Sequence, residues 1–134
     1  QRPELFRAVV CDVPLLDMVR YTRFKIALLW TSEYGDPSKP DEFKWLYAYS
    51  PYHHVKDATP YPAVLLMTAE SDSRVDPMHA RKMCARLQEA TNSRRPVLLR
   101  YERKAGHGAG KPLSKAIETA VDQYSFLMWQ LGMN

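Results

Sequence analysis

Three short apolar runs constrain the fold of this 134-residue chain more than any other feature of its sequence. They occupy residues 7–11 (RAVVC), 63–68 (AVLLMT) and 97–101 (VLLRY), with Pro or Asp close to their ends. Continuous apolar runs of this length are typical of strands that are buried on both faces, as in a parallel sheet. The runs therefore predict three strands at the centre of the fold.

Helical patterns follow the second and third runs. Asp76 and Pro77 predict an N-cap and a first helical residue, and apolar residues then recur at helical spacing until about residue 90, at Ala80, Met83, Cys84 and Leu87. A longer C-terminal helix is expected to end at Gly132 and to bury one apolar stripe, formed by Leu113, Ile117, Ala120, Val121, Tyr124, Leu127, Met128 and Leu131. The order strand, helix, strand, helix predicts parallel strands joined by a right-handed crossover.

The stretch between the first two strands, residues 13–59, has a different character. It is rich in aromatic residues and prolines, and it predicts helices and loops laid across one end of the sheet. Three strands are few for an open sheet of this kind, so we expect a partner sheet or a missing remainder of the same sheet. The predicted class is α/β, with mostly parallel strands and flanking helices in one unit covering residues 1–134.

Composition excludes several classes of function. The net charge is +4, but the basic residues mostly lie near acids and form no run interleaved with aromatics, so no nucleic-acid partner is expected. No apolar run approaches the roughly 20 residues that cross a bilayer, so no membrane partner is expected either. Cys11 and Cys84 resemble small core residues, which mildly favours a reducing compartment.

No metal or other cofactor is expected. His53 and His54 are adjacent, but neighbouring side chains on extended chain point apart, and no third ligand is spaced to join them. The two cysteines form no zinc-binding pattern.

Two loops after predicted strands contain the residues most suited to chemistry. ESDSRVDP, which follows the second strand, contains Asp72 and Arg74, although acids in such places also cap helices and shape turns. KAGHGAGKP, which follows the third strand, holds His107 between Gly106 and Gly108. Glycines on both sides allow unusual backbone angles and a close approach to the ring. In open α/β sheets, reactive groups collect on loops of this kind.

The order of these two residues fits a catalytic triad that lacks its nucleophile. In α/β-hydrolases the triad runs Ser, Asp, His along the chain, and Asp72 precedes His107 by one helix and one strand. The carboxylate would fix the imidazole tautomer, and the second ring nitrogen would act as general base. The chain contains no G-x-S-x-G elbow upstream of Asp72, since Ser32, Ser38 and Ser50 lack flanking glycines. We therefore expect the chain to begin after the nucleophile.

At these residues the sequence resembles the prolyl oligopeptidase family of serine peptidases. The resemblance covers essentially the whole chain and is strongest at AGHGAGKP, at DSRV from Asp72, at WTSEYG from Trp30 and at YSPYHHV from Tyr49. In the family a GGSxGG elbow lies shortly before a QRPELF-like stretch, and this chain opens with QRPELF. The resemblance thus implies the C-terminal portion of an α/β-hydrolase fold, with the nucleophile segment and the β-propeller outside the chain.

The resemblance also implies roles for individual residues. Asp72 and His107 match the triad acid and base, and Arg74 matches an arginine that binds a substrate carbonyl near the cleaved proline. Trp30 matches a tryptophan that stacks on the proline ring, while Tyr34, Val75 and Leu15 match further pocket walls. Trp30 and Tyr34 could equally be ordinary core aromatics, and Arg74 could simply pair with a neighbouring acid. Relatives more often carry a second acid where this chain has Ser73.

The expected function is to supply the triad Asp and His of a serine endopeptidase that cleaves short peptides on the carboxyl side of proline through an acyl-enzyme. Its partners would be a proline-containing oligopeptide and the remainder of the catalytic domain. One alternative is a catalytically silent fragment that docks with that remainder or self-associates. Another is a related oligopeptidase or acyl-peptide hydrolase of different specificity. A cytoplasmic location is expected, with the periplasm as the alternative if a missing N-terminal segment carries a signal.

Overall fold

The computed structural model describes residues 1–103, 106–107 and 112–133. Its strands are β1 (Ala8–Asp12), β2 (Ala63–Ala69) and β3 (Val97–Glu102). Its α-helices are α1 (Thr31–Tyr34), α2 (Pro40–Tyr49), α3 (Met78–Ala90) and α4 (Leu113–Leu131). Short 3-10 helices are η1 (Pro3–Leu5), η2 (Tyr21–Arg23), η3 (Ala27–Trp30) and η4 (Pro51–His54). Within the described residues no helix is both long and apolar enough to span a membrane.

The three strands form one parallel sheet in the order β1-β2-β3, which confirms the predicted strands to within one residue at each end. Ala8 pairs with Ala63 on one side of β2, and Val64 pairs with Val97 on the other. All seven residues of β2 are buried. The outer edge of β1 has no partner strand among the described residues, as expected for part of a larger sheet.

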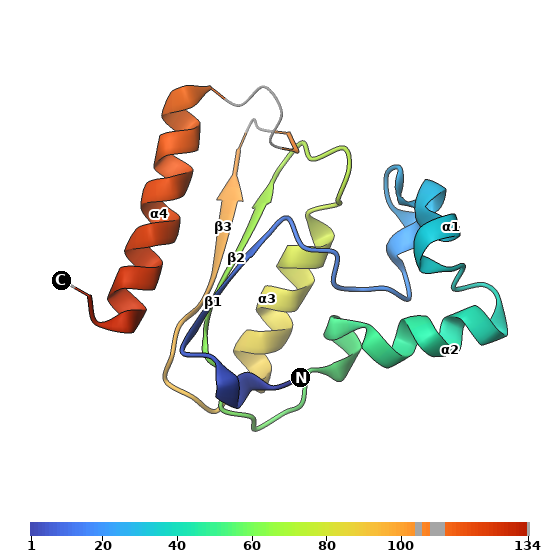
Figure 1. Ribbon diagram of the computed structural model, residues 1–134, viewed down its shortest axis with the longest axis horizontal. Coiled ribbons are helices and arrows are strands. Elements are labelled where there is room, and N and C mark those ends of the chain that lie inside the picture. Colours follow the sequence, from blue (N-terminus) through green and yellow to red (C-terminus); the bar gives the residue numbers. More distant parts are fainter. Residues whose placement is uncertain (104–105, 108–111, 134) are drawn as a thin grey trace.

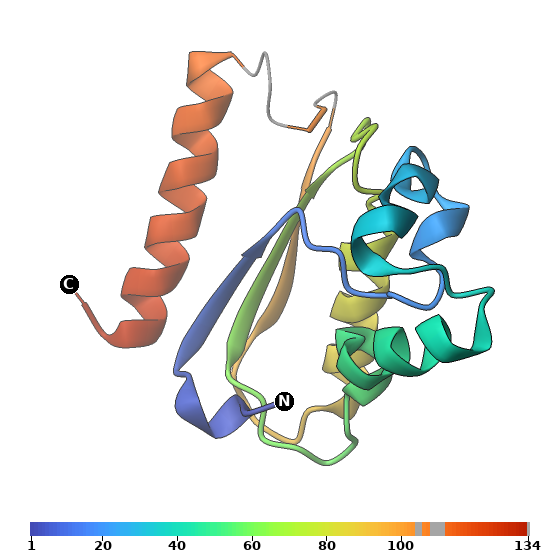
Figure 2. The ribbon, with the colours of Figure 1, turned by 45° about the vertical axis from the view of Figure 1, so that its right-hand side comes forward.

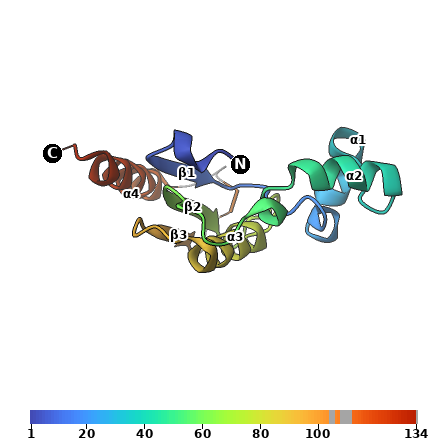
Figure 3. The same cartoon turned by 90° about the horizontal axis from the view of Figure 1, so that it is seen from below.

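Alternating side chains of β2 supply two separate cores, one on each face of the sheet. Val64 and Leu66 pack with α3 through Ala80, Cys84 and Leu87. Leu65 and Met67 pack with Phe126 of α4 on the opposite face. Figures 1 and 3 show the resulting three layers, with α3 and α4 on opposite sides of the strands. The two-sided burial explains why the strands read as continuous apolar runs.

The start of α3 differs slightly from the prediction. The helix begins at Met78 rather than Pro77, and the Asp76 carboxylate accepts the Met78 N–H at 2.9 Å. Asp76 therefore still satisfies a backbone donor at the helix start, one residue later than expected. Cys84 is buried in the core, and Cys11 packs against it partly buried; both are free thiols.

The predicted buried stripe of α4 is wrong. Only Phe126 and Gln130 of this helix are buried, while most of the expected stripe is exposed by 42% to 76%, at Leu113, Ile117, Val121, Tyr124, Met128 and Leu131. Leu127 alone of that set packs against the sheet core. The periodicity identified an apolar face correctly, but the sheet lies against the neighbouring face of the helix.

Residues 13–59 form a separate lobe of short helices, as predicted. Figure 2 shows this lobe beside α3 and on the side away from α4, rather than across the end of the sheet. Its own small core contains Met18, Tyr21, Ala27 and Leu46. Gly35 has a φ of +109°, and a Cβ there would lie 2.9 Å from the Trp45 indole nitrogen, so the turn between α1 and α2 requires glycine.

Candidate active site

The candidate site lies at the carboxyl edge of the sheet, where β2 and β3 end. Asp72 follows β2 by three residues, and its side chain is fully buried. One carboxylate oxygen, Oδ1, accepts the backbone N–H groups of Arg74 and Val75, both at 2.8 Å. This Asx-type turn holds the carboxylate in one orientation without help from a distant element.

His107 follows β3 and meets Asp72 directly. Its Nδ1 lies 2.8 Å from Oδ2 and 3.0 Å from Oδ1 of the Asp72 carboxylate. The preceding residue, Gly106, lies against the other loop, where an added Cβ would be 3.7 Å from the Ser71 carbonyl oxygen. The flanking Gly108 lies outside the described residues. The two loops are therefore joined at the residues that the sequence singled out.

The pairing fixes what the imidazole can do. A carboxylate can only accept, so Nδ1 carries a proton, and in the neutral ring Nε2 on the far side is the nitrogen that can accept another. The His107 side chain is 37% exposed although Asp72 is fully buried. The pair thus has a buried end that orients the ring and an open end that can take a proton.

Arg74 and Trp30, predicted as substrate-binding residues, lie next to each other. The Arg74 guanidinium carbon is 5.8 Å from the centroid of the Trp30 ring, within cation–π range. Among the described residues Arg74 forms no ion pair with Asp72 or Asp76, the alternative considered from sequence. Trp30 in turn meets Tyr34 edge-to-face, with ring centroids 6.4 Å apart.

The two remaining predicted pocket residues have different surroundings. Leu15 is partly buried and packs, with Trp30, against the small core of the lobe. Val75 is partly buried and joins the site through its backbone N–H to Asp72. The structure thus brings Asp72 to His107, Arg74 to Trp30 and Trp30 to Tyr34, and it packs Leu15 against the same small core as Trp30.

The backbone of two histidines outside this site differs from that expected from the sequence. The extended backbone expected for His53 and His54 is wrong, because both residues lie on the 3-10 helix η4. His53 Nδ1 contacts the Ser50 hydroxyl, and His54 Nδ1 donates to the Ser50 carbonyl oxygen. Within the described part of the chain, no three His, Cys, Asp or Glu side chains are grouped to hold a metal ion.

Sequence reasoning missed a polar cluster around the buried Asp17, in which Ser50 and His79 are buried and Arg20 and Lys82 reach the surface. The only local signal was an acid, Asp17, within a mostly apolar stretch. Arg20 lies only three residues from Asp17, but Ser50, His79 and Lys82 come from segments much later in the sequence, so spacing alone could not reveal them.

The parallel sheet and the acid–histidine pair on consecutive loops define the α/β-hydrolase class. The model of the prolyl oligopeptidase family matches residues 1–134. The prolyl endopeptidase of Dictyostelium discoideum is 41% identical over 129 residues, covering 94% of this chain and 17% of that protein. Prolyl oligopeptidase A of Amanita bisporigera is 38% identical over 133 residues, covering 98% and 18%. The chain belongs to the prolyl oligopeptidase family.

Solved structures agree with this assignment. One structure from a study of two prolyl endopeptidases matches with a TM-score of 0.96 and 54% identity, over 100% of this chain and 20% of that one. Substrate-bound prolyl oligopeptidase B of Galerina marginata matches with a TM-score of 0.90 and 36% identity, over 96% and 18%. This chain therefore spans about a fifth of the length of these relatives.

Proposed function

We propose that this chain supplies the acid and base of a serine endopeptidase that cleaves peptides after proline. The observation that supports the proposal most is the contact between Asp72 and His107 at the carboxyl edge of the sheet. Relatives described as prolyl endopeptidases add support, and the Galerina marginata enzyme binds hydrolysis and macrocyclization substrates. The nucleophilic serine would come from the part of the catalytic domain outside this chain.

The chemistry follows from the orientation of the imidazole. His107 Nε2 takes the serine proton as the hydroxyl oxygen attacks the substrate carbonyl, and Asp72 stabilises the resulting imidazolium. His107 then gives the proton to the departing amine, which leaves an acyl-enzyme. In the second half, the same nitrogen takes a proton from water as the water oxygen attacks the acyl carbon. The bond between the acyl carbon and the serine oxygen then breaks, the serine oxygen takes that proton from the imidazolium, and the acid product leaves. The proton balance closes, so the enzyme is regenerated.

Proline specificity would come from the aromatic face beside this pair. A proline ring is apolar and its nitrogen has no proton in a peptide, so the Trp30 face can cover it without an unsatisfied donor. Tyr34, Leu15 and Val75 would form further walls, and Arg74 would donate to a substrate carbonyl oxygen. A pocket with these walls does not suit a charged side chain, which disfavours the alternative of a peptidase that prefers basic residues.

The test is hydrolysis of chromogenic peptides by the full-length protein that contains this chain. The wild-type protein and a His107→Ala variant should be assayed with matched peptides that place Pro, Ala or Arg before the scissile bond. We expect the Pro peptide to be cleaved fastest and His107→Ala to abolish most of that activity without changing the unfolding temperature. Equal rates for the two proteins would end the proposal, and a preference for Arg would favour the alternative specificity.

A second proposal concerns the role of this chain as a structural part. We infer that the free edge of β1 and the exposed apolar stripe of α4 dock against the remainder of the catalytic domain. Unpaired edges and large apolar patches are both sites of association. Ile117→Lys in the full-length protein should lower its unfolding temperature, while the matched change at the adjacent exposed residue, Glu118→Lys, should not. Sedimentation of the isolated chain as a monomer with cooperative unfolding would count against this role.

A further inference from the structure

A second buried carboxylate, Asp17, lies outside the Asp72–His107 pair and has no part in the mechanism above. Its side chain is 1% exposed, and Oδ2 accepts hydrogen bonds from Lys82 Nζ at 2.6 Å and Arg20 Nη1 at 3.1 Å. Burial alone would raise the pKa of Asp17, but the hydrogen bonds from Lys82 and Arg20 and the charges of Lys82 and His53 outweigh it, and the pKa is lowered. Asp17 is therefore a fixed anion between two cations.

His79 holds the backbone of the same segment from the side of α3. Its Nδ1 accepts the Asp17 N–H at 3.1 Å and, more weakly, the Leu16 N–H at 3.4 Å. Nδ1 must then be unprotonated, which places the proton on Nε2. That nitrogen is buried and has no hydrogen-bond partner within the described residues. Leaving such a donor unpaired destabilises the folded protein, and a purely space-filling side chain would avoid that cost. The role of the His79 ring is therefore to supply Nδ1 as an acceptor for the backbone N–H groups of Leu16 and Asp17.

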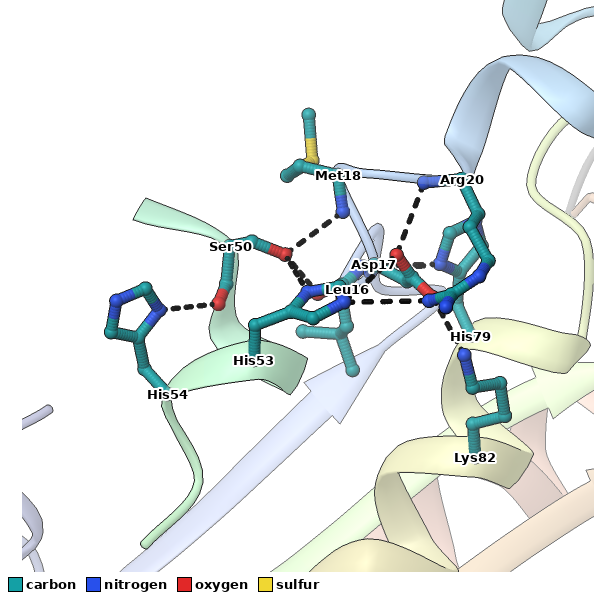
Figure 4. A network of polar contacts seen from close by, with 9 residues as sticks. All are labelled: Leu16, Asp17, Met18, Arg20, Ser50, His53, His54, His79 and Lys82. Carbon is teal, nitrogen blue, oxygen red and sulfur yellow. Dashed lines mark hydrogen bonds and ion pairs between the residues drawn. The ribbon is translucent and has the colours of Figure 1, made fainter. Parts of the chain in front are cut away.

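Ser50 and the residues after it hold the segment from the opposite side. The Ser50 hydroxyl accepts the Met18 N–H at 3.0 Å, and the Tyr52 N–H donates to the Leu16 carbonyl oxygen at 3.0 Å. Figure 4 shows Leu16, Asp17 and Met18 between these two sets of groups. We call the group Asp17, Arg20, Ser50, His79 and Lys82 the Asp17 joint. It fixes three consecutive backbone N–H groups by side chains from distant segments.

The Asp17 joint connects the two halves of the candidate site. On one side, Leu15 precedes the clamped segment, and it shares with Trp30 the small core that includes Met18. On the other side, His79 and Lys82 lie on the first turns of α3, directly after the Asp72 loop. The His79 N–H donates to the Asp76 carbonyl oxygen at 3.1 Å, which ties the ring to the end of that loop.

We propose that Asp17 and His79 are positioning residues for the proline pocket, holding Leu15 and Trp30 at a fixed place relative to the Asp72–Arg74 loop. This inference rests on the proposed function. Neither residue is among the predicted pocket residues. A misplacement of about 1 Å at a positioning element can reduce catalysis about a hundredfold, although a loosened joint should cause only part of that loss. The triad itself should remain intact, because Asp72 is oriented by its own turn.

The first experiment separates pocket placement from triad chemistry in the full-length protein. Asp17→Asn and His79→Leu should lower kcat/KM for a Pro-linked chromogenic peptide by on the order of tenfold, mainly through KM. Inactivation by a small fluorophosphonate that has no proline should stay within about twofold of wild type, since it needs the triad but not the pocket. His79→Asn should recover most of the loss, because its amide oxygen can accept the same N–H groups.

The chain offers a matched control in Asp57→Asn. Asp57 also pairs with a cation on α3, Arg86, one turn beyond Lys82, but its side chain is 75% exposed and Arg86 is not a predicted pocket residue. This variant should behave as wild type in both assays. Wild-type kinetics for Asp17→Asn would overturn the inference. A parallel fall of peptide cleavage and inactivation would overturn it too, because the effect would then lie in the triad or the fold.

Hydrogen exchange tests the joint independently of activity. In the full-length protein, Asp17→Asn should speed amide exchange in peptides covering residues 15–20 and 27–34, and leave α4 unchanged. If the wild-type protein cleaves Pro peptides but exchange does not change, the joint is wrong and the proposed function stands. If exchange changes but the wild-type protein does not cleave Pro peptides, the proposed function is wrong, and with it the role of the joint in substrate binding.

Discussion

The two buried aspartates, Asp72 and Asp17, have the same side chain and nearly the same burial but opposite surroundings. Asp72 is held by two backbone N–H groups and one imidazole, and no Lys or Arg forms an ion pair with it in the described part of the chain. Asp17 is held by Lys82 and Arg20, which neutralise it inside the protein. The Asp72 carboxylate meets an imidazole within hydrogen-bond distance, whereas the Asp17 carboxylate accepts hydrogen bonds from groups that are already charged and has the His53 imidazole only at 3.9 Å.

The difference shows how surroundings assign a role to a buried carboxylate. A carboxylate paired with cations has a counter-charge throughout the neutral pH range, so it is suited to fixing structure. A carboxylate that meets an imidazole is suited to a group whose charge appears only during the reaction. Substitutions at the two aspartates should therefore separate, with kcat lost at Asp72 and stability lost, together with a rise in KM, at Asp17.

The largest expected effect is on the kcat of the Asp72→Asn variant of the full-length protein. The amide can still accept the Arg74 and Val75 N–H groups, so the turn and the unfolding temperature should change little. It cannot supply the negative charge that orients and stabilises the His107 imidazolium, and kcat should fall by roughly 10⁴-fold. Steady-state kinetics with a Pro-linked peptide, beside the Asp57→Asn control, measure this. A loss below tenfold would remove the distinction between the two aspartates.

The next effect is on stability, in Asp17→Asn. This change leaves the Lys82 ammonium and Arg20 guanidinium without their anion, and both are only partly exposed. We expect the free energy of unfolding to fall by about 2–3 kcal/mol, near the lower end for breaking a buried ion pair because the cations can reach solvent. Urea unfolding followed by tryptophan fluorescence measures the change. The double variant Asp17→Asn/Lys82→Met should recover part of the loss, since it also removes a stranded charge. Full additivity of the two single changes would contradict the pairing.

The parts of this contrast that the sequence predicted are the local ones. Each strand is one continuous apolar run, and the Asp72 turn is closed by residues two and three positions later, so short windows contain the necessary information. The contact between Asp72 and His107 spans 35 residues. It was still predictable, because parallel strands bring the loops after them to the same edge.

The parts that the sequence did not predict depend on distant partners. Burial of Asp17 requires Lys82, which lies 65 residues away on a different element, and no spacing rule joins them. The α4 prediction failed for a related reason. Periodicity shows which face of a helix is apolar, but it does not show what covers that face, and the sheet contacts Phe126 instead of the main stripe.

A smaller effect concerns pH and distinguishes the histidine of the joint from that of the active site. Burial lowers the pKa of His79 below 6.5, helped by Lys82 and opposed by the charges of Asp17 and Asp76. As pH falls, the unfolded chain therefore binds this proton at a higher pH than the folded protein does. The free energy of unfolding should decline as pH falls from above 6.5 to the pKa of His79 in the folded protein. His79→Asn should flatten this decline. Urea midpoints at about pH 7.5, 6.5 and 5.5 measure it. An equally steep decline in His79→Asn would assign the pH dependence to another group, such as His53, whose pKa burial also lowers.

The smallest effect is expected from Tyr21→Phe. This variant tests whether weakening the lobe at another place raises KM in the same way as loss of the Asp17 joint. The Tyr21 hydroxyl is buried and donates to the Gly35 carbonyl oxygen at 2.6 Å, and burial raises its pKa to about 12. Removing that donor should cost about 1 kcal/mol of unfolding free energy, while the ring keeps its edge contact with Tyr34. Because the backbone of residues 16–18 remains clamped, kcat/KM for the Pro peptide should change much less than in Asp17→Asn. A selective rise in KM equal to that of Asp17→Asn would show that general rigidity of the lobe, and not the buried carboxylate, places the pocket.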